Sequence, residues 1–115
     1  MSRVFVVQET TIYDDEGNLV RTKNLSDARQ YGELIYLVPA RPVRGSTDYY
    51  EHMDELLADF TDDDYLMPIG APEYIAAAGA YAADANGGHY RLLRWLREER
   101  RYIVIDVRLW EPNDG

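Results

Sequence analysis

The sequence contains no cysteine, and that absence excludes several kinds of site at once. Without thiols the chain has no disulfide framework, no thiol nucleophile and no thiolate ligand for a metal. A reducing cytoplasm is therefore the compartment that we expect. Long apolar runs are absent as well, because no segment approaches the roughly 20 apolar residues that a membrane-spanning helix needs. Residues 1–7 have the pattern of a strand rather than that of a signal peptide.

The sequence also lacks the motifs of common catalytic and cofactor sites. It has no G-x-S-x-G, no H-E-x-x-H and no glycine-rich phosphate loop, and its only histidines are His52 and His89. The three aspartates at 62–64 lack the alternating spacing and the bidentate glutamate of a calcium loop, which favours a solvated turn. We therefore predict no catalytic residue, no metal site and no cofactor, and this favours a protein that is not an enzyme.

What the chain does have is an excess of negative charge that is confined to one region. Its 115 residues include 21 Asp and Glu against 12 Lys and Arg, a net charge of −9. Residues 1–47 and 85–115 are nearly balanced, whereas residues 48–84 contain no Lys or Arg. A field of this sign repels nucleic acid and anionic membranes and attracts basic partners. The acids of this region are Asp48, Glu51, Asp54, Glu55, Asp59, Asp62, Asp63, Asp64, Glu73 and Asp84.

Hydrophobic periodicity predicts an alternation of strands and helices. Apolar residues in 48–60 recur at helical spacing, while every second residue from Ile103 to Leu109 is aliphatic, as in a strand with one buried face. The prediction is a single α/β domain over residues 1–115, a layered structure with a mixed sheet, two main helices and a C-terminal antiparallel hairpin. We expect strands at 4–8, 33–38, 65–69, 90–96 and 102–109, a short hairpin within 10–22, and helices at 27–31, 48–60 and 72–85.

Three local features refine this prediction. Ser26 is placed to cap the first helix, because a serine oxygen can accept a hydrogen bond from a free amide of the first turn. Gly79, in the alanine-rich helix at 72–85, allows that helix to approach the sheet closely. Of the ten tyrosines, Tyr36 and Tyr49 are expected to lie in the core.

Several segments of the chain together resemble a group of phage proteins. These segments are Val4–Glu9, Asp59–Leu66, Gly70 with Pro72, Ile75–Ala78, Leu92–Trp95 and Arg101–Ile103. In them the chain resembles small proteins of tailed bacteriophages and prophages that have no assigned activity. The resemblance implies a phage-derived protein that works in a bacterial cytoplasm, where small acidic proteins often act by binding.

The acidic helix and the turn that follows it are the main candidate site. Carboxylates on a helix can occupy the arginine and lysine positions that phosphates would otherwise fill, and tyrosines bury a large area with little loss of rotamer freedom. We predict a non-enzymatic binding protein that docks this surface on a basic surface of a partner protein, such as a host protein that handles nucleic acid. The predicted contact residues are Tyr50, Glu51, Asp54, Glu55, Asp59, Asp62, Asp63, Asp64 and Tyr65.

Two other regions support alternative hypotheses. The bend at Gly70, Ala71 and Glu73 joins a strand to a helix N-terminus, which suggests a small ligand- or nucleotide-binding domain. The C-terminal hairpin offers a second surface, which in a self-assembling protein would meet the acidic region of another copy. Direct binding of nucleic acid is not expected, because strand alternation sends the arginines to both faces. The residues of this second surface are Arg91, Arg94, Trp95, Arg97, Arg100 and Arg101.

Overall fold

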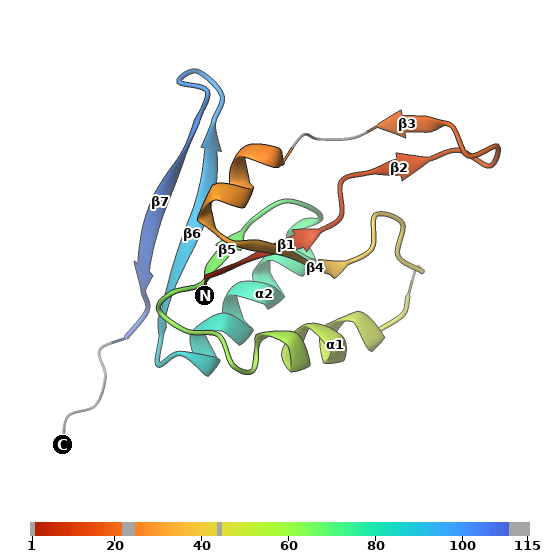
Figure 1. The fold of residues 1–115 in the computed structure, drawn as a ribbon. Helices are drawn as coiled ribbons and strands as arrows, with labels where there is room; N and C mark the ends of the chain where they lie inside the picture. The colour runs from red at the N-terminus through yellow and green to blue at the C-terminus, as the bar shows by residue number, and fades with distance from the viewer. Residues whose placement is uncertain (1, 22–24, 44, 111–115) are drawn as a thin grey trace.

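The computed structural model, which describes residues 2–21, 25–43 and 45–110, has an α/β fold built on a mixed five-stranded sheet (Figure 1). The strand order is β4-β1-β5-β6-β7, in which the first four strands run parallel and β7 runs antiparallel to β6. The predicted fold class, with its C-terminal antiparallel hairpin, is confirmed. The strands of this sheet are β1 (Arg3–Gln8), β4 (Glu33–Val38), β5 (Tyr65–Met67), β6 (His89–Leu96) and β7 (Arg101–Arg108).

β1 lies inside the sheet, between β4 and β5, and its side chains are apolar on both faces. Val4 and Val6 point to one face while Phe5 and Val7 point to the other, and none of the four is more than 1% exposed. A strand with this pattern is stable only where both faces of the sheet are covered. β1 therefore contributes to both halves of the core.

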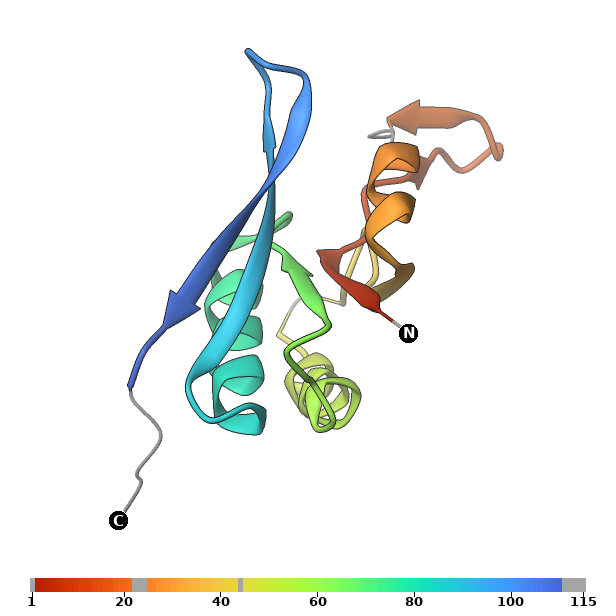
Figure 2. The ribbon, with the colours of Figure 1, turned by 60° about the vertical axis from the view of Figure 1, so that its left-hand side comes forward.

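Two helices, α1 (Asp48–Leu57) and α2 (Pro72–Ala85), cover one face of the sheet (Figure 2). The predicted apolar stripe of α1 faces the sheet, and Leu57 is fully buried. α2 approaches the sheet closely at Gly79, where an added Cβ would lie 3.2 Å from the hydroxyl oxygen of Tyr90. The apolar side chains of the two helices and of the facing strands form the larger half of the core.

The opposite face is covered only in part, by the short 3₁₀ helix η1 (Ser26–Tyr31). Ala28 of η1 belongs to the same buried cluster as Leu93 and Tyr102 from the C-terminal hairpin. Tyr31 also meets Tyr102 edge to face, with ring centroids 6.1 Å apart. The predicted short hairpin is present away from the main sheet and consists of β2 (Ile12–Tyr13) and β3 (Leu19–Arg21) (Figure 1).

Three local predictions are wrong, each because packing rather than local pattern decides the position. η1 begins at Ser26, so Ser26 is not its cap, and the cap position holds Leu25, whose side chain is buried. Tyr36 is 37% exposed instead of lying in the core, because β4 is an edge strand. In β7 the buried residue is Tyr102, which packs with η1, whereas the aliphatic residues on the predicted inner face are half-buried.

Asp64 requires a fourth correction, because the predicted solvated turn contains a buried carboxylate. Its side chain is 1% exposed and accepts hydrogen bonds from the amide and guanidinium of Arg3 and from the amide and hydroxyl of Thr61. Burial alone would raise the pKa of Asp64, but the bonds from Arg3 and Thr61 outweigh it and hold the pKa below its ordinary value of 3.8. The ion pair, 2.7 Å between Arg3 Nη2 and Asp64 Oδ2, joins the start of β1 to the turn before β5.

We expect Asp64→Asn to lower the free energy of unfolding by about 2 to 3 kcal/mol, because the Arg3 guanidinium loses its buried charged partner and keeps only the exposed Asp59. The carboxylate of the wild type stabilises the fold above the ordinary pKa of 3.8, and this stabilisation is lost as the pH falls through the lower pKa of the folded state. Urea unfolding at neutral and at acidic pH measures both effects. Asp63→Asn, at an exposed position in the same turn, is the control and should change the free energy by less than about 0.5 kcal/mol. Equal stability of the two variants would contradict this prediction.

Candidate functional site

The outward side of α1 carries four exposed carboxylates, those of Asp48, Glu51, Asp54 and Glu55. None of the four forms an ion pair with another residue in the part of the chain that the structure describes. Within the described residues no base therefore compensates these charges, which act outward into solvent. We refer to these four residues as the acidic face.

A hollow of about 430 Å³ lies next to the acidic face, between the end of β4 and the first turns of α1. The residues that line it include Glu9 and Asp48, which are acidic, and Tyr36 and Tyr49, which are aromatic. The Tyr49 hydroxyl accepts a hydrogen bond from the Val43 amide at 2.9 Å, which holds the ring in place. Carboxylates beside aromatic rings are suited to a lysine or arginine side chain. The two tyrosines expected in the core are thus the ones that border the acidic face.

The two tyrosines predicted to contact a partner do not line this hollow. Tyr50 packs inward against Tyr74, with ring centroids 5.6 Å apart. Tyr65 lies on the other face of the sheet, where the guanidinium carbon of Arg91 is 4.1 Å from its ring centroid. Closeness in sequence grouped both with the acidic helix. The structure separates Tyr65 from the acidic face, whereas Tyr50 is half-buried on α1, one helical turn from Asp54.

The aspartates that follow α1 have four different environments. Asp59 is exposed but pairs with Arg3, at 3.1 Å between Oδ1 and Nη1. Asp63 is exposed, Asp62 is exposed but hydrogen-bonded to the side chains of Asn86 and His89, and Asp64 is buried. The structure therefore adds Asp59, Asp62 and Asp63 to the exposed acidic surface, whereas the Asp64 carboxylate is inaccessible to a partner in this fold.

His89, at the start of β6, links the turn after α1 to β7. Its Nδ1 lies 2.7 Å from Asp62 Oδ1 and its Nε2 lies 2.5 Å from Asp106 Oδ1. The hydrogen bonds to Asp106 and then to Asp62 raise the pKa of His89 above its ordinary value of 6.5. The bonds from Asn86 and His89 lower the pKa of Asp62, and the bond from His89 lowers that of Asp106. A protonated imidazole between two carboxylates is the arrangement that these shifts favour.

Sequence reasoning missed this His89 cluster because its members are far apart in the chain. Asp62 and Asp106 are 27 and 17 residues from His89, and no motif has those spacings. The three side chains hold each other, and within residues 2–21, 25–43 and 45–110 no group of three or more His, Asp or Glu is placed to hold a metal ion. We call this cluster the His89 clamp, because its hydrogen bonds join the turn after α1 to β6 and β7.

The bend predicted to bind a ligand is occupied by a side chain of the protein itself. It lies at the carboxyl ends of β1 and β5, where the strand order reverses and where ligands bind in many open α/β sheets. Here Gln8 Oε1 accepts a hydrogen bond from the Ala71 amide at 2.9 Å, and Gln8 Nε2 donates to two carbonyls just after β4. Gly70 has φ +127, and an added Cβ there would lie 2.5 Å from Gln8 Cβ. The amide that the ligand hypothesis needs is thus already bonded, and Glu73 is exposed beside it.

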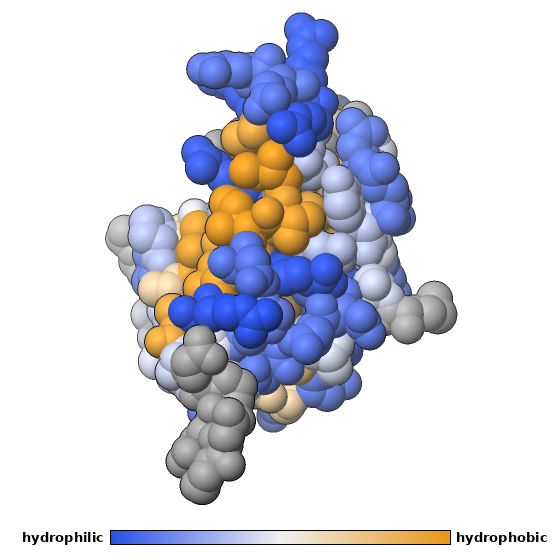
Figure 3. All heavy atoms as spheres, turned by 90° about the vertical axis from the view of Figure 1, so that its left-hand side faces the viewer, coloured by the Kyte–Doolittle hydropathy of each residue, from blue (hydrophilic) through white to orange (hydrophobic). Residues whose placement is uncertain are grey.

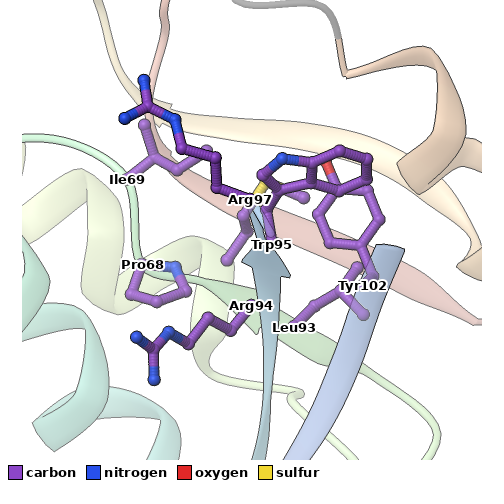
Figure 4. Close-up of a pocket in the computed structure, with 8 residues that line it drawn as sticks. Pro68, Ile69, Leu93, Arg94, Trp95, Arg97 and Tyr102 are labelled. Carbon is purple, nitrogen blue, oxygen red and sulfur yellow. The ribbon is translucent and has the colours of Figure 1, made fainter. Parts of the chain in front are cut away.

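A second hollow, of about 440 Å³, lies where β6 continues beyond the end of the short strand β5 (Figure 4). Arg94, Trp95 and Arg97 are among the residues that line it. Figure 4 shows the two arginines extending to one side of β6, while the Trp95 indole lies over Tyr102 on the other. The centroids of these two rings are 4.9 Å apart, so the Trp95 indole packs against a residue of its own chain.

The remaining arginines of the predicted second surface are found at other places. Arg91 lies over the ring of Tyr65, which packs against Tyr31 of η1. Arg100 and Arg101 lie at the tip of the hairpin, where Arg101 pairs with Glu99 at 3.1 Å. The six residues predicted for this surface therefore do not form one continuous basic patch.

The His89 clamp should make stability depend on pH. Because its pKa is raised in the folded state, the stabilisation by His89 is fully present below its ordinary pKa of 6.5 and is lost as the pH rises through the higher pKa. We expect His89→Gln to lower the melting temperature more at about pH 5.5 than at about pH 9. His52→Gln, at an exposed position on α1, is the control and should have little effect at either pH. Thermal unfolding monitored by circular dichroism tests this, and an equal loss at both pH values would exclude the clamp.

The bend at Gly70 should be sensitive to any side chain. We expect Gly70→Ala to lower the free energy of unfolding by about 2 kcal/mol, because the new Cβ collides with Gln8 and the residue keeps a positive φ. Gly17→Ala is the control, since Gly17 has φ +85 but nothing lies within 4 Å of its added Cβ. In urea unfolding, Gly17→Ala should lower the free energy of unfolding by less than Gly70→Ala does. A larger decrease for Gly17→Ala would show that the contact between position 70 and Gln8 is not tight.

Comparison with known proteins places the chain in a phage family. No curated protein and no solved structure matches the sequence. A family model, described as Phage Pam3 gp32-like protein, matches residues 2–109. The match runs from the residue before β1 to the residue after β7, so it includes both helices and every strand described above. The chain therefore belongs to the Phage Pam3 gp32-like protein family.

Proposed function

We propose that this phage protein is a non-enzymatic binding protein that docks the acidic face of α1 on a basic surface of a partner protein. The observation that carries the proposal is the position of the acidic face beside the hollow that Tyr36 and Tyr49 line. The carboxylates attract lysine and arginine over a long range, and the rings supply contact area and cation–π attraction at short range.

A host protein that handles nucleic acid is the class of partner that this chemistry favours. Such proteins present lysine and arginine to phosphates, and most of their affinity comes from those contacts. Carboxylates on one face of a helix can pair with the same cations and thereby compete with the nucleic acid. In this proposal the protein acts in the bacterial host, as an inhibitor-like ligand of the partner.

The proposal of a small ligand-binding domain at the Gly70 bend has less support. Its central feature was a free amide at a helix N-terminus, and Gln8 already accepts the hydrogen bond of the Ala71 amide. An anion at this position would have to displace Gln8 and lie close to the exposed carboxylate of Glu73. The acidic face requires no such displacement.

Charge reversal on α1 tests the proposed docking surface. We expect the triple variant Glu51→Lys, Asp54→Lys, Glu55→Lys to capture its partner from a host-cell lysate at least about tenfold less well than the wild type, because its attraction to basic groups becomes repulsion. The measurement is quantitative mass spectrometry of proteins retained on the immobilised chain at low and high salt.

The matched control changes the net charge equally at exposed acids outside α1, in the variant Asp15→Lys, Glu16→Lys, Asp27→Lys. It should retain the captured partner, because the acidic face is intact. Capture of the same proteins by the wild type and by the α1 variant would refute the proposal. Equal loss in both variants would also refute it, since net charge and not the acidic face would then govern binding.

A further inference from the structure

The outer edge of β7 is an unusually open strand edge. β7 pairs with β6 along its whole length and is the last strand in the sheet order, so no strand lies on its other side in the part of the chain that the structure describes. Residues 101–108 contain no proline or glycine, and the register with β6 has no bulge. Proteins usually protect such edges with proline, bulges, short strands or inward-pointing charges.

The backbone groups that point outward from β7 can be identified. The Leu109 amide donates to the Gly88 carbonyl at 2.8 Å, and the regular register then directs the odd-numbered residues of β7 to β6. The even-numbered residues direct their amides and carbonyls away from the sheet. These residues are Tyr102, Val104, Asp106 and Arg108.

The side chains along this edge are mostly apolar. Val104 is 44% exposed in the middle of the strand, and Ile103, Ile105 and Val107 are half-buried on the helix side of the sheet. Figure 3 shows a hydrophobic stripe on this side of the molecule, below a hydrophilic hairpin tip. The one acid within the strand, Asp106, forms ion pairs with His89 and Arg108. Its charge is therefore compensated and does not block the approach of another strand to this edge.

We propose that the β7 edge pairs with the β7 edge of a second copy of this chain, antiparallel and about a two-fold axis. A register in which all four outward residues form interchain hydrogen bonds places the two-fold axis at Ile105. Ile105 of one copy then lies opposite Ile105 of the second copy. Tyr102 falls opposite the second copy's Arg108, and Val104 falls opposite its Asp106. On the helix side Ile103 falls opposite Val107 of the second copy. No two like charges face each other, so the strand is complementary to itself.

The other open edge of the sheet lacks this self-complementarity. β4 begins with an exposed acid, Glu33. Pro39 follows its last residue and has no backbone amide that could donate to an added strand. An axis perpendicular to the sheet keeps the faces of the two copies aligned. The helix layers of both copies would therefore lie on the same side of one continuous sheet. This inference rests on β7 alone and does not depend on the proposed function.

The first experiment measures the mass of the full chain in solution by light scattering over a range of concentrations and salt. We expect a dimer that persists at high salt, since hydrogen bonds and apolar contacts hold it. Val104→Pro removes only an outward amide and should weaken the dimer at least about tenfold, because the symmetric pair loses two interchain hydrogen bonds. Val104→Thr, which keeps the amide and the branched shape, is the control and should remain dimeric.

The second experiment tests the register by disulfide cross-linking. Because the chain has no cysteine of its own, only the introduced cysteine can form the disulfide. Ile105→Cys should form a disulfide-linked dimer under mild oxidation, since directly opposite Cβ atoms are about 4.5 to 5.5 Å apart. Val107→Cys is the control, because its symmetry mate lies four residues away, about 13 Å along the strands. Faster cross-linking of the first variant supports the proposed pairing.

Three results would overturn the proposal. The first is a monomer at every concentration up to about the millimolar range, where a specific interface is occupied. The second is a dimer that salt dissociates and Val104→Pro leaves unchanged, which indicates contact between charged surfaces. The third is Ile105→Cys cross-linking no faster than Val107→Cys. If circular dichroism shows that Val104→Pro does not fold, the cross-linking comparison alone decides.

Discussion

The ion pair between Arg3 and Asp64 is the constraint on which the arrangement of the layers depends. Asp64 is the buried charged residue of the described core, and an unpaired carboxylate at that position would cost several kcal/mol. Arg3 opens β1 while Asp64 immediately precedes β5, so their bonds adjoin the parallel pairing of Val4 with Tyr65. Arg3 also donates to the Asp59 carbonyl just after α1. One side chain thus positions the central strands and the end of the helix that carries the acidic face.

The two faces of the sheet are covered unequally, and both proposed surfaces follow from this. On the helix side α1 and α2 cover the larger half of the core, and the acidic face of α1 points away from that core. On the opposite side η1 is the one helix among the described residues, and β5 stops after three residues while β6 runs for eight. The hairpin of β6 and β7 therefore projects beyond the rest of the sheet (Figure 1). The outer edge of β7 is open in the described residues because β7 is the last strand of the sheet order. The family match includes both α1 and β7.

Local pattern predicted well the parts of the fold that depend on neighbours in the chain. The aliphatic run of β1, the helical stripe of α1 and the glycine in α2 each predicted the observed packing, because burial on one face is encoded at a fixed period. The candidate site was predicted less well. The outward carboxylates of α1 could be assigned from the stripe, whereas Tyr50 and Tyr65 were grouped with them by closeness in sequence and lie in different packing environments.

The sequence by itself determined the order of strands and helices, the mixed α/β class and the segregation of negative charge to residues 48–84, because periodicity and charge are properties of consecutive residues. Only the tertiary structure decided that Asp64 is buried while Glu51 is exposed, that Tyr36 and not Tyr50 lines the hollow beside the acidic face, and that His89 joins two distant aspartates. The physical reason is strand order. Pairing β1 with both β4 and β5 sets which side chains meet across long separations in the chain, and no local pattern carries that information.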